Sequence, residues 1–310
     1  MPDSASEYDY LARGQALLQV GNFLAAIADF TEALEINPNL AAAYYYRGIA
    51  QRNSGNFSLA IADYTSAVEV EPDYPVAFYA RGVVHRHLEH YEAAISDYDQ
   101  AIELEPEDGD FYYARGVAHA SLKHYDEAIR DFLEALDLNP EMPNAWYNLG
   151  IAHRDLGKRE QALEYYSTAL KLRPNEPDYC YARGNLYSDL HRYDEAVTDY
   201  DRALAAVPSF ANAFYNRGIA LRNLGKPAQA IASFNEALRH GPEFANLIMN
   251  RGIAHADDGD YASALSDLDR ALDLDSGLAA AFRARAGIHQ TLGNAEQAGA
   301  DWREFERLSE

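Results

Sequence analysis

Histidine is the residue type in this sequence with the clearest potential for metal or proton chemistry, because an imidazole can bind a metal ion or exchange a proton near neutral pH. Four histidines each follow a glycine by three residues, His85, His119, His153 and His255, and His289 has the same place in the last unit, three residues after Ala286. Their separations are multiples of 34 residues, so a regular repeat would distribute them along the molecule. His85, His87 and His90 are closer together, but near one helix end their rings would point in different directions. We therefore expect the periodic histidines to pack between elements, and we predict no metal site.

Cysteine chemistry is also limited. The single cysteine, Cys180, has no evident activating base in its neighbourhood and occupies a position that elsewhere holds a large packing residue. The chain contains no glycine-rich phosphate loop and no compact group of acids and bases. The sequence thus predicts no catalytic residue, no cofactor and no enzyme activity. One cysteine also excludes an intrachain disulfide, which suits a reducing compartment.

The elements that position these residues follow a strict period. Glycine recurs every 34 residues, at Gly14, Gly48, Gly82, Gly116, Gly150, Gly184, Gly218 and Gly252. Twelve residues after each glycine stands an alanine, and four residues further on stands a large apolar residue: Phe30, Tyr64, Tyr98, Phe132, Tyr166, Tyr200, Phe234 and Leu268. The last unit has Ala286 in place of the glycine and continues the series with Ala298 and Trp302. A proline closes most units. A period of this size indicates stacked units rather than one globular core.

This order of residues resembles the tetratricopeptide repeat. The resemblance covers nearly the whole chain and implies an all-α fold, a right-handed superhelical solenoid of antiparallel helix pairs. We expect disorder in residues 1–6 and one solenoid over 7–310, with nine units of which the last is truncated: 7–40, 41–74, 75–108, 109–142, 143–176, 177–210, 211–244, 245–278 and 279–310.

Helix boundaries follow from glycine and proline. In the second unit the pattern predicts helices over 41–54 and 58–71, separated by Gly55, because glycine adopts the left-handed conformation that commonly ends a helix. Glycine fills the same place in six units: Gly21, Gly55, Gly157, Gly225, Gly259 and Gly293. Gly48 and Ala60 would allow the two helices to approach closely while Tyr44 and Tyr64 fill the neighbouring gaps.

An arginine precedes the periodic glycine in most units, where the family often has leucine. Seven of these arginines are followed sixteen residues later by an aspartate. The fifth unit has lost both residues, with Leu149 and Tyr165 in their places, and the seventh combines Arg217 with Ser233. We predict that each arginine pairs with the aspartate on the second helix of its own unit.

The resemblance implies that the first helices line a concave groove, with repeat positions two, five, nine, twelve and thirteen pointing inward. Position five holds tyrosine in six consecutive units: Tyr45, Tyr79, Tyr113, Tyr147, Tyr181 and Tyr215. Tyrosine combines a broad apolar ring with a polar tip, which suits a protein interface. The alternative is that these rings only pack against neighbouring helices.

Other groove positions complete the candidate peptide-binding site. Position nine is mostly aliphatic, and position twelve supplies Arg52, Arg86, Arg154 and Arg222. Such a surface would accept a partner segment with hydrophobic and acidic groups. The carboxylate clamp of chaperone-binding family members is matched only by Asn185 and Asn216, because its cationic places hold Tyr181, Asn246 and Asn250. We therefore include the two asparagines in the site but predict that the clamp is absent.

Charge and hydropathy limit the partners. The formal net charge is −23, from 26 basic and 49 acidic residues, which argues against nucleic acid because phosphate binding requires a basic face. No segment approaches the roughly 18 apolar residues of a membrane span, and the first residues do not resemble a secretory signal. We expect a soluble, cytoplasmic protein.

The predicted function is a non-enzymatic scaffold that holds a peptide or helix of a partner protein in the concave groove. Two alternatives stay open. The chain could self-associate through its C-terminal unit, where Trp302 and Phe305 stand near the end. It could also be the regulatory subunit of an enzyme encoded elsewhere.

Overall fold

The computed structural model describes residues 5–309, and all the regular elements in this range are helices. Their bounds are α1 Glu7–Gln19, α2 Phe23–Ile36, α3 Ala41–Asn53, α4 Phe57–Val70, α5 Pro75–His87, α6 Tyr91–Leu104, α7 Gly109–Ser121, α8 Tyr125–Leu138, α9 Pro143–Asp155, α10 Arg159–Leu172, α11 Pro177–Asp189, α12 Tyr193–Ala206, α13 Ala211–Asn223, α14 Pro227–His240, α15 Ala245–Asp257, α16 Tyr261–Leu274, α17 Ala279–Thr291 and α18 Ala295–Ser309. The predicted all-α fold is confirmed.

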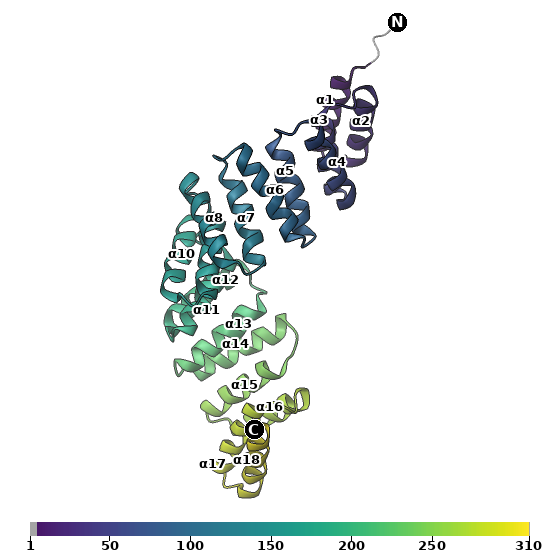
Figure 1. Ribbon diagram of the computed structural model, residues 1–310. Coiled ribbons are helices and arrows are strands. Elements are labelled where there is room, and N and C mark those ends of the chain that lie inside the picture. The colour runs from purple at the N-terminus through teal and green to yellow at the C-terminus, as the bar shows by residue number, and fades with distance from the viewer. Residues whose placement is uncertain (1–4, 310) are drawn as a thin grey trace. The chain divides into compact units, whose positions relative to one another are not determined.

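Each 34-residue unit is one antiparallel helix pair, as predicted (Figure 1). In the second unit the helices cover Ala41–Asn53 and Phe57–Val70, so each ends one residue before its expected end. The six glycines expected after the first helices all have positive φ, between 68° and 87°. In the remaining three units Glu89, Lys123 and His191 adopt the same conformation with φ near 60°. This conformation strains a side chain with a Cβ, so the turn geometry is kept even where glycine is absent.

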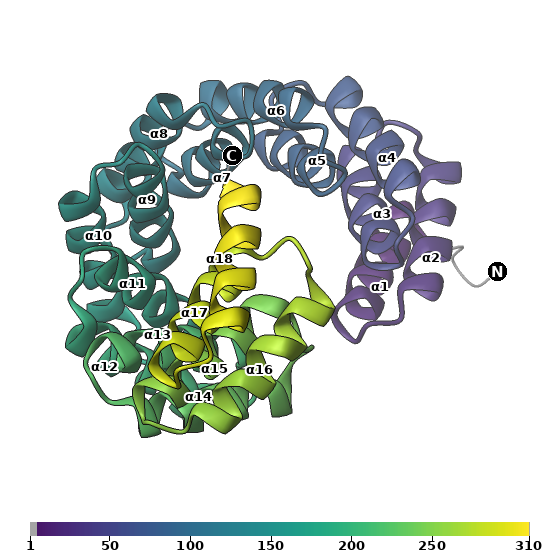
Figure 2. The same cartoon turned by 90° about the horizontal axis from the view of Figure 1, so that it is seen from below.

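The helices stack in chain order. From α1 to α9 and from α11 to α18, each second helix packs on the first helix of its own pair and on the next first helix where one follows, and consecutive first helices also contact each other. The chain divides into two compact halves, an N-terminal half Met1–Tyr165 and a C-terminal half Tyr166–Glu310, with the boundary inside α10. In the N-terminal half the odd-numbered helices lie on the inner side of the arc and the even-numbered helices on the outer side (Figure 2). We call the side formed by the odd-numbered helices the first-helix face.

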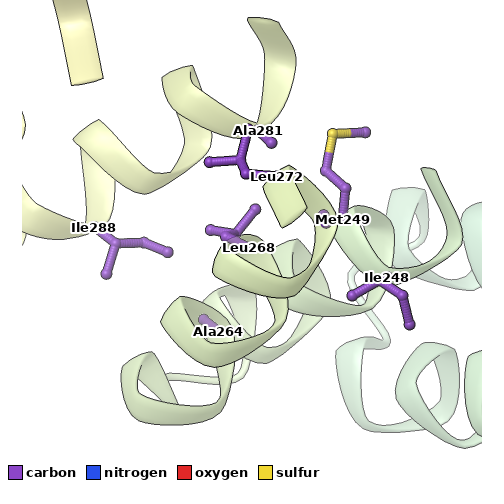
Figure 3. Close-up of a cluster of buried hydrophobic side chains, with 8 residues drawn as sticks. Ile248, Met249, Ala264, Leu268, Leu272, Ala281 and Ile288 are labelled. Carbon is purple, nitrogen blue, oxygen red and sulfur yellow. The ribbon is translucent and has the colours of Figure 1, made fainter. Parts of the chain in front are cut away.

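Small residues allow the close helix packing that the repeat requires. A Cβ on Gly48 would lie 2.7 Å from the ring of Tyr64, and this ring is completely buried. Ala60 is completely buried too, so the prediction about this pair of small residues is confirmed. In the C-terminal half Leu268 has the place that Tyr64 has in its repeat, and it packs within an aliphatic cluster (Figure 3).

The predicted arginine–aspartate pairs form in every unit that has both residues. The pairs are Arg13–Asp29, Arg47–Asp63, Arg81–Asp97, Arg115–Asp131, Arg183–Asp199, Arg251–Asp267 and Arg285–Asp301. The aspartates are buried while the arginines keep some exposure, for example side-chain values of 18% for Arg81 and 7% for Asp97. Arg217 donates instead to Ser233. We call these eight arginines the arginine ladder.

The arginine ladder also connects neighbouring units, which the sequence did not predict. A second guanidinium nitrogen donates to a residue sixteen positions earlier, on the second helix of the preceding unit. Arg81 reaches Thr65 in this way at 3.0 Å, and Arg183 reaches Ser167 at 3.0 Å. The acceptor is Asp201 for Arg217 and Asn235 for Arg251. Each such arginine therefore joins three helices.

Two further features concern the chain as a whole. Of the segment 1–6 that we expected to be disordered, residues 1–4 lie outside the described range, but Ser6 is ordered and caps α1, accepting a hydrogen bond from the amide of Asp9. Over the described residues, no helix combines the length and apolar character that a bilayer crossing requires.

Candidate binding surface on the first helices

The six predicted tyrosines, here called the tyrosine row, share one place in the fold. Each is the fifth residue of a first helix, in α3, α5, α7, α9, α11 and α13. All six are partly buried. Because 34 residues complete one helix pair, equal spacing in the sequence places equivalent side chains in successive repeats along each half of the chain. The tyrosine row thus lies on first helices, and its use as a groove-lining position stays a prediction.

Much of each ring is used for packing. The Tyr79 ring lies 5.8 Å from the ring of buried Tyr98 and 5.0 Å from that of Phe111, at the start of the next unit. Tyr181 lies 6.1 Å from the ring of Tyr200 and 4.8 Å from that of Phe210, the last residue of its own repeat. Burial raises the pKa of Tyr79 above its ordinary value. The rings therefore do pack between neighbouring elements, as the alternative held, and offer only their remaining exposed edges to a partner.

Three tyrosine hydroxyls are fixed by asparagines of the following unit. Asn148 donates to Tyr113 at 3.0 Å, Asn216 to Tyr181 at 3.0 Å and Asn250 to Tyr215 at 3.1 Å. The asparagines occupy position six, directly after the tyrosine position of their own unit. These contacts orient the asparagine amides along the first-helix face, so part of their hydrogen-bonding capacity is already satisfied within the protein.

Asn185 and Asn216, predicted to belong to one site, come together in the C-terminal half. The Asn185 carbonyl oxygen accepts hydrogen bonds from the Asn216 amide at 2.8 Å and from the Tyr200 hydroxyl at 2.9 Å. The two asparagines line an open cavity of about 270 Å³ with Ser188, Asp189, Tyr200 and Ile219. Among residues 5–309 no group bonds to the Asn185 amide nitrogen or to the Asn216 carbonyl oxygen. These atoms stay available as a donor group and an acceptor group, the complement of a peptide group. Tyr200 is a member that sequence reasoning assigned to packing alone.

The four position-twelve arginines differ in their partners. Arg154 forms an ion pair with Asp155 at 2.8 Å, and Arg222 donates to Asn250 at 3.1 Å. Arg52 is 3.4 Å from the side-chain oxygen of Asn53. Within the described part of the chain, Arg52, Arg86 and Arg222 have no carboxylate partner. The structure thus separates Arg154 from the other three as the arginine already occupied by a carboxylate.

The histidines and the cysteine lie in packed surroundings. His153 is 6% exposed, and its ring centroid is 4.9 Å from that of Tyr165. Burial lowers the pKa values of His85, His119 and His153. Over residues 5–309, no three potential ligands among His, Cys, Asp and Glu gather closely enough to hold a metal ion. Cys180 is completely buried, and burial raises the pKa of its thiol to about 11, which opposes formation of a nucleophilic thiolate.

Comparisons with known proteins agree with this architecture. Models described as Tetratricopeptide repeat match residues 11–75, 47–97, 79–135, 181–245, 215–279 and 143–176, and a model described as TPR repeat matches 121–157. No curated protein matches the chain.

Solved structures share the fold. MamA is 25% identical with a TM-score of 0.50, covering 54% of this chain and 97% of its own. MamA of Desulfovibrio magneticus RS-1 is 22% identical with a TM-score of 0.53, covering 56% and 98%. YrrB, described as a TPR protein with an unusual peptide-binding site, is 24% identical with a TM-score of 0.51, covering 59% and 95%. Because the family models match well over half of its residues, the chain belongs to the tetratricopeptide repeat family.

Proposed function

We propose that the chain is a non-enzymatic scaffold that binds an extended segment of a partner protein along the first-helix face. The observation that carries the proposal is the amide pair of Asn185 and Asn216, which presents one free donor and one free acceptor beside an open cavity. A partner backbone exposes the matching carbonyl and amide groups when it is extended, whereas a helix satisfies them internally. The pair therefore favours an extended segment over a helix.

The tyrosine row supplies the apolar part of the proposed contact. Its rings are held by neighbouring aromatic side chains, so little side-chain entropy is lost when a partner packs on their exposed edges. Three hydroxyls are also fixed by asparagines. The fold is compatible with this use, since YrrB has a tetratricopeptide repeat fold and a peptide-binding site.

Phage display of random dodecapeptides on the immobilised full chain tests the proposal. We expect enriched peptides to bind the wild type and to lose at least tenfold in affinity with Tyr79→Ala/Tyr113→Ala/Tyr147→Ala. Asn185→Ala/Asn216→Ala should lower the affinity of peptides that contact the C-terminal half. The matched control is Tyr10→Ala/Tyr44→Ala/Tyr112→Ala, which removes three rings that lie beneath guanidinium groups of the arginine ladder at 5.1–5.6 Å. If both triple variants stay folded by circular dichroism and bind as tightly as the wild type, the tyrosine row is not part of the binding surface.

Self-association is the second candidate, favoured by an aromatic pair on the last helix. The rings of Trp302 and Phe305 in α18 are 5.7 Å apart in an edge-on arrangement and only partly buried. Light scattering of the wild type and of Trp302→Ala/Phe305→Ala over a range of concentrations tests this use. A monomeric wild type at all concentrations would exclude it.

A further inference from the structure

A pocket in the N-terminal half, between the second and third repeats, is lined by two arginines that form no ion pair in the described residues. It lies between α3 and α5, beside the start of α4, and its volume is about 350 Å³. Its lining residues are Arg52, Asn53, Phe57, Val83, Val84, Arg86 and His87. We call it the two-arginine pocket. Only Arg52 and Arg86 among these residues had been assigned to a site from the sequence.

The charge of this pocket contrasts with that of the whole chain. The protein has 49 acidic residues against 26 basic ones, yet no carboxylate lines the two-arginine pocket. In the described residues neither Arg52 nor Arg86 forms an ion pair, whereas Arg47 and Arg81 on the same two helices each hold an aspartate. The Nε group of Arg86 is buried without a hydrogen-bond acceptor. The guanidinium group also lies beside the Tyr98 hydroxyl, and Arg86 as a whole is only partly buried. A partly desolvated cation without a carboxylate partner is costly, so an anion that meets the rest of this guanidinium group in the pocket would gain from the contact.

The remaining walls are largely apolar. The rings of Phe57 and His87 are 4.5 Å apart, and Val83, Val84 and the polar Asn53 complete the lining. The volume is at the lower end of the roughly 300–1,000 Å³ of typical ligand pockets. It therefore suits one or two side chains of a partner, with an apolar group on the walls and an anionic group at the guanidinium groups.

The C-terminal half contains an equivalent pocket without cationic side chains. The pocket between α15 and α17 has a volume of about 250 Å³. Residues 204 positions later occupy equivalent places, with Ala256 for Arg52, Asp257 for Asn53, Tyr261 for Phe57, Gly287 for Val83, Ile288 for Val84 and Thr291 for His87. The repeat architecture thus creates a pocket at this junction in both places. The two-arginine pocket is the version with cationic side chains.

We propose that the two-arginine pocket binds a carboxylate of the partner segment together with an adjacent apolar side chain. This inference rests on the proposed function and adds to it a class of ligand, an acidic–apolar peptide. The planar guanidinium group donates two parallel hydrogen bonds to a carboxylate, which gives such contacts both strength and geometric selectivity. The partner's acidic residue would thus be located over repeats two and three, in spite of the overall repulsion between an acidic peptide and this protein.

Matched peptides test the proposal by fluorescence anisotropy. The first contains Leu-Glu-Phe-Glu-Leu between Ser-Gly flanks, and the second replaces both glutamates by glutamine. Both have blocked ends, and a third, glutamine-containing peptide ends on a free leucine carboxylate. With the wild type in low salt we expect the glutamate peptide to bind about tenfold to a hundredfold more tightly than its blocked glutamine analogue, as charge-assisted hydrogen bonds allow. Equally tight binding of the third peptide would identify a chain-end carboxylate as a suitable ligand.

Variants assign the selectivity to the pocket. Arg52→Gln/Arg86→Gln should reduce the glutamate-to-glutamine ratio to about 1. The control Arg130→Gln/Arg239→Gln removes the same charge at side chains that are 72% and 67% exposed, and it should retain the ratio. Arg52→Lys/Arg86→Lys should give an intermediate ratio, because the charge remains but the planar guanidinium group is lost.

The outcomes separate this inference from the proposed function. If both blocked peptides bind equally well to the wild type and lose affinity in the tyrosine triple variant, the first-helix face binds peptides but the pocket assignment is wrong. An unchanged ratio in Arg52→Gln/Arg86→Gln would also overturn the assignment. If none of the three peptides binds the folded wild type, the acidic–apolar ligand class is refuted, while the phage selection still decides the proposed function.

Discussion

The arginine ladder gives the most direct energetic test of the fold, and Arg81 with Asp97 is its clearest rung. Asp97 accepts from Arg81 at 2.7 Å and 3.0 Å, and the same guanidinium group donates to Thr65 at 3.0 Å. Breaking a fully buried ion pair costs about 3–5 kcal/mol, and breaking an exposed one costs about 0–1 kcal/mol. The Arg81 side chain keeps 18% of its exposure, so Asp97→Ala should lower the free energy of unfolding by about 2–3 kcal/mol.

A double-mutant cycle isolates the pairwise part of this energy. We expect Arg81→Ala, Asp97→Ala and the double variant to give a coupling free energy of about 2 kcal/mol, because the pair includes two well-aligned charge-assisted hydrogen bonds. Urea unfolding followed by circular dichroism provides the four values, with one unfolding model applied to all four proteins because repeat arrays can depart from two-state behaviour.

An exposed pair on a second helix serves as the control. Arg130 and Glu127 are 3.3 Å apart, with side-chain exposures of 72% and 45%, so their cycle should give a coupling below about 0.5 kcal/mol. If Arg81 and Asp97 also behave additively to within about 0.5 kcal/mol, the arginine ladder does not stabilise the repeats and the reasoning from burial is refuted.

Three other perturbations have distinct expected outcomes. Gly82→Ala should destabilise the protein by about 2 kcal/mol, because a Cβ would lie 2.7 Å from the buried Tyr98 ring, whereas Gly287→Ala, whose Cβ would enter open space within a helix, should stabilise it by about 0.5–1 kcal/mol; urea titration that finds the same sign for both would contradict this packing argument. Lys123→Gly should stabilise by about 0.5 kcal/mol by relieving strain at φ 61°, and an unchanged or lower thermal midpoint would show that no such strain exists. Burial lowers the pKa of His85 below its ordinary value of 6.5, so as the pH falls His85 is protonated in the unfolded chain before it is protonated in the folded one. The stability contributed by neutral His85 should therefore be complete above pH 6.5 and decrease as the pH falls below it. Circular dichroism melts at pH 7.5 and 5.5 should show a smaller drop in the thermal midpoint for His85→Gln than for the wild type.

The repeat pattern allowed much of the fold to be predicted. Arg81 and Asp97 could be paired because the fifth unit lacks both members together, with Leu149 and Tyr165 instead. The helix ends could be predicted where glycine marks the left-handed turn. They carried no such mark at Lys123, which adopts the same φ with a side chain that gives no local signal.

Other contacts could not be predicted because their chemistry varies from unit to unit. The ladder acceptor in the preceding unit is threonine, serine, asparagine or aspartate, so no single residue type repeats at that position. The tyrosine row was correctly placed on first helices, but the bond from Asn148 to Tyr113 depends on how one unit lies on the next. The two-arginine pocket escaped notice because Phe57 and His87 belong to different helices of different repeats.

The double role of each ladder arginine bears on how the protein melts. Arg81 bonds both to Asp97 in its own repeat and to Thr65 in the preceding one, so fraying of either repeat strands a half-buried cation in the other. In the language of a one-dimensional Ising chain, this raises the nearest-neighbour coupling relative to the intrinsic stability of a single repeat. Amide protons of α4, α5 and α6 should therefore exchange as one cooperative block rather than repeat by repeat.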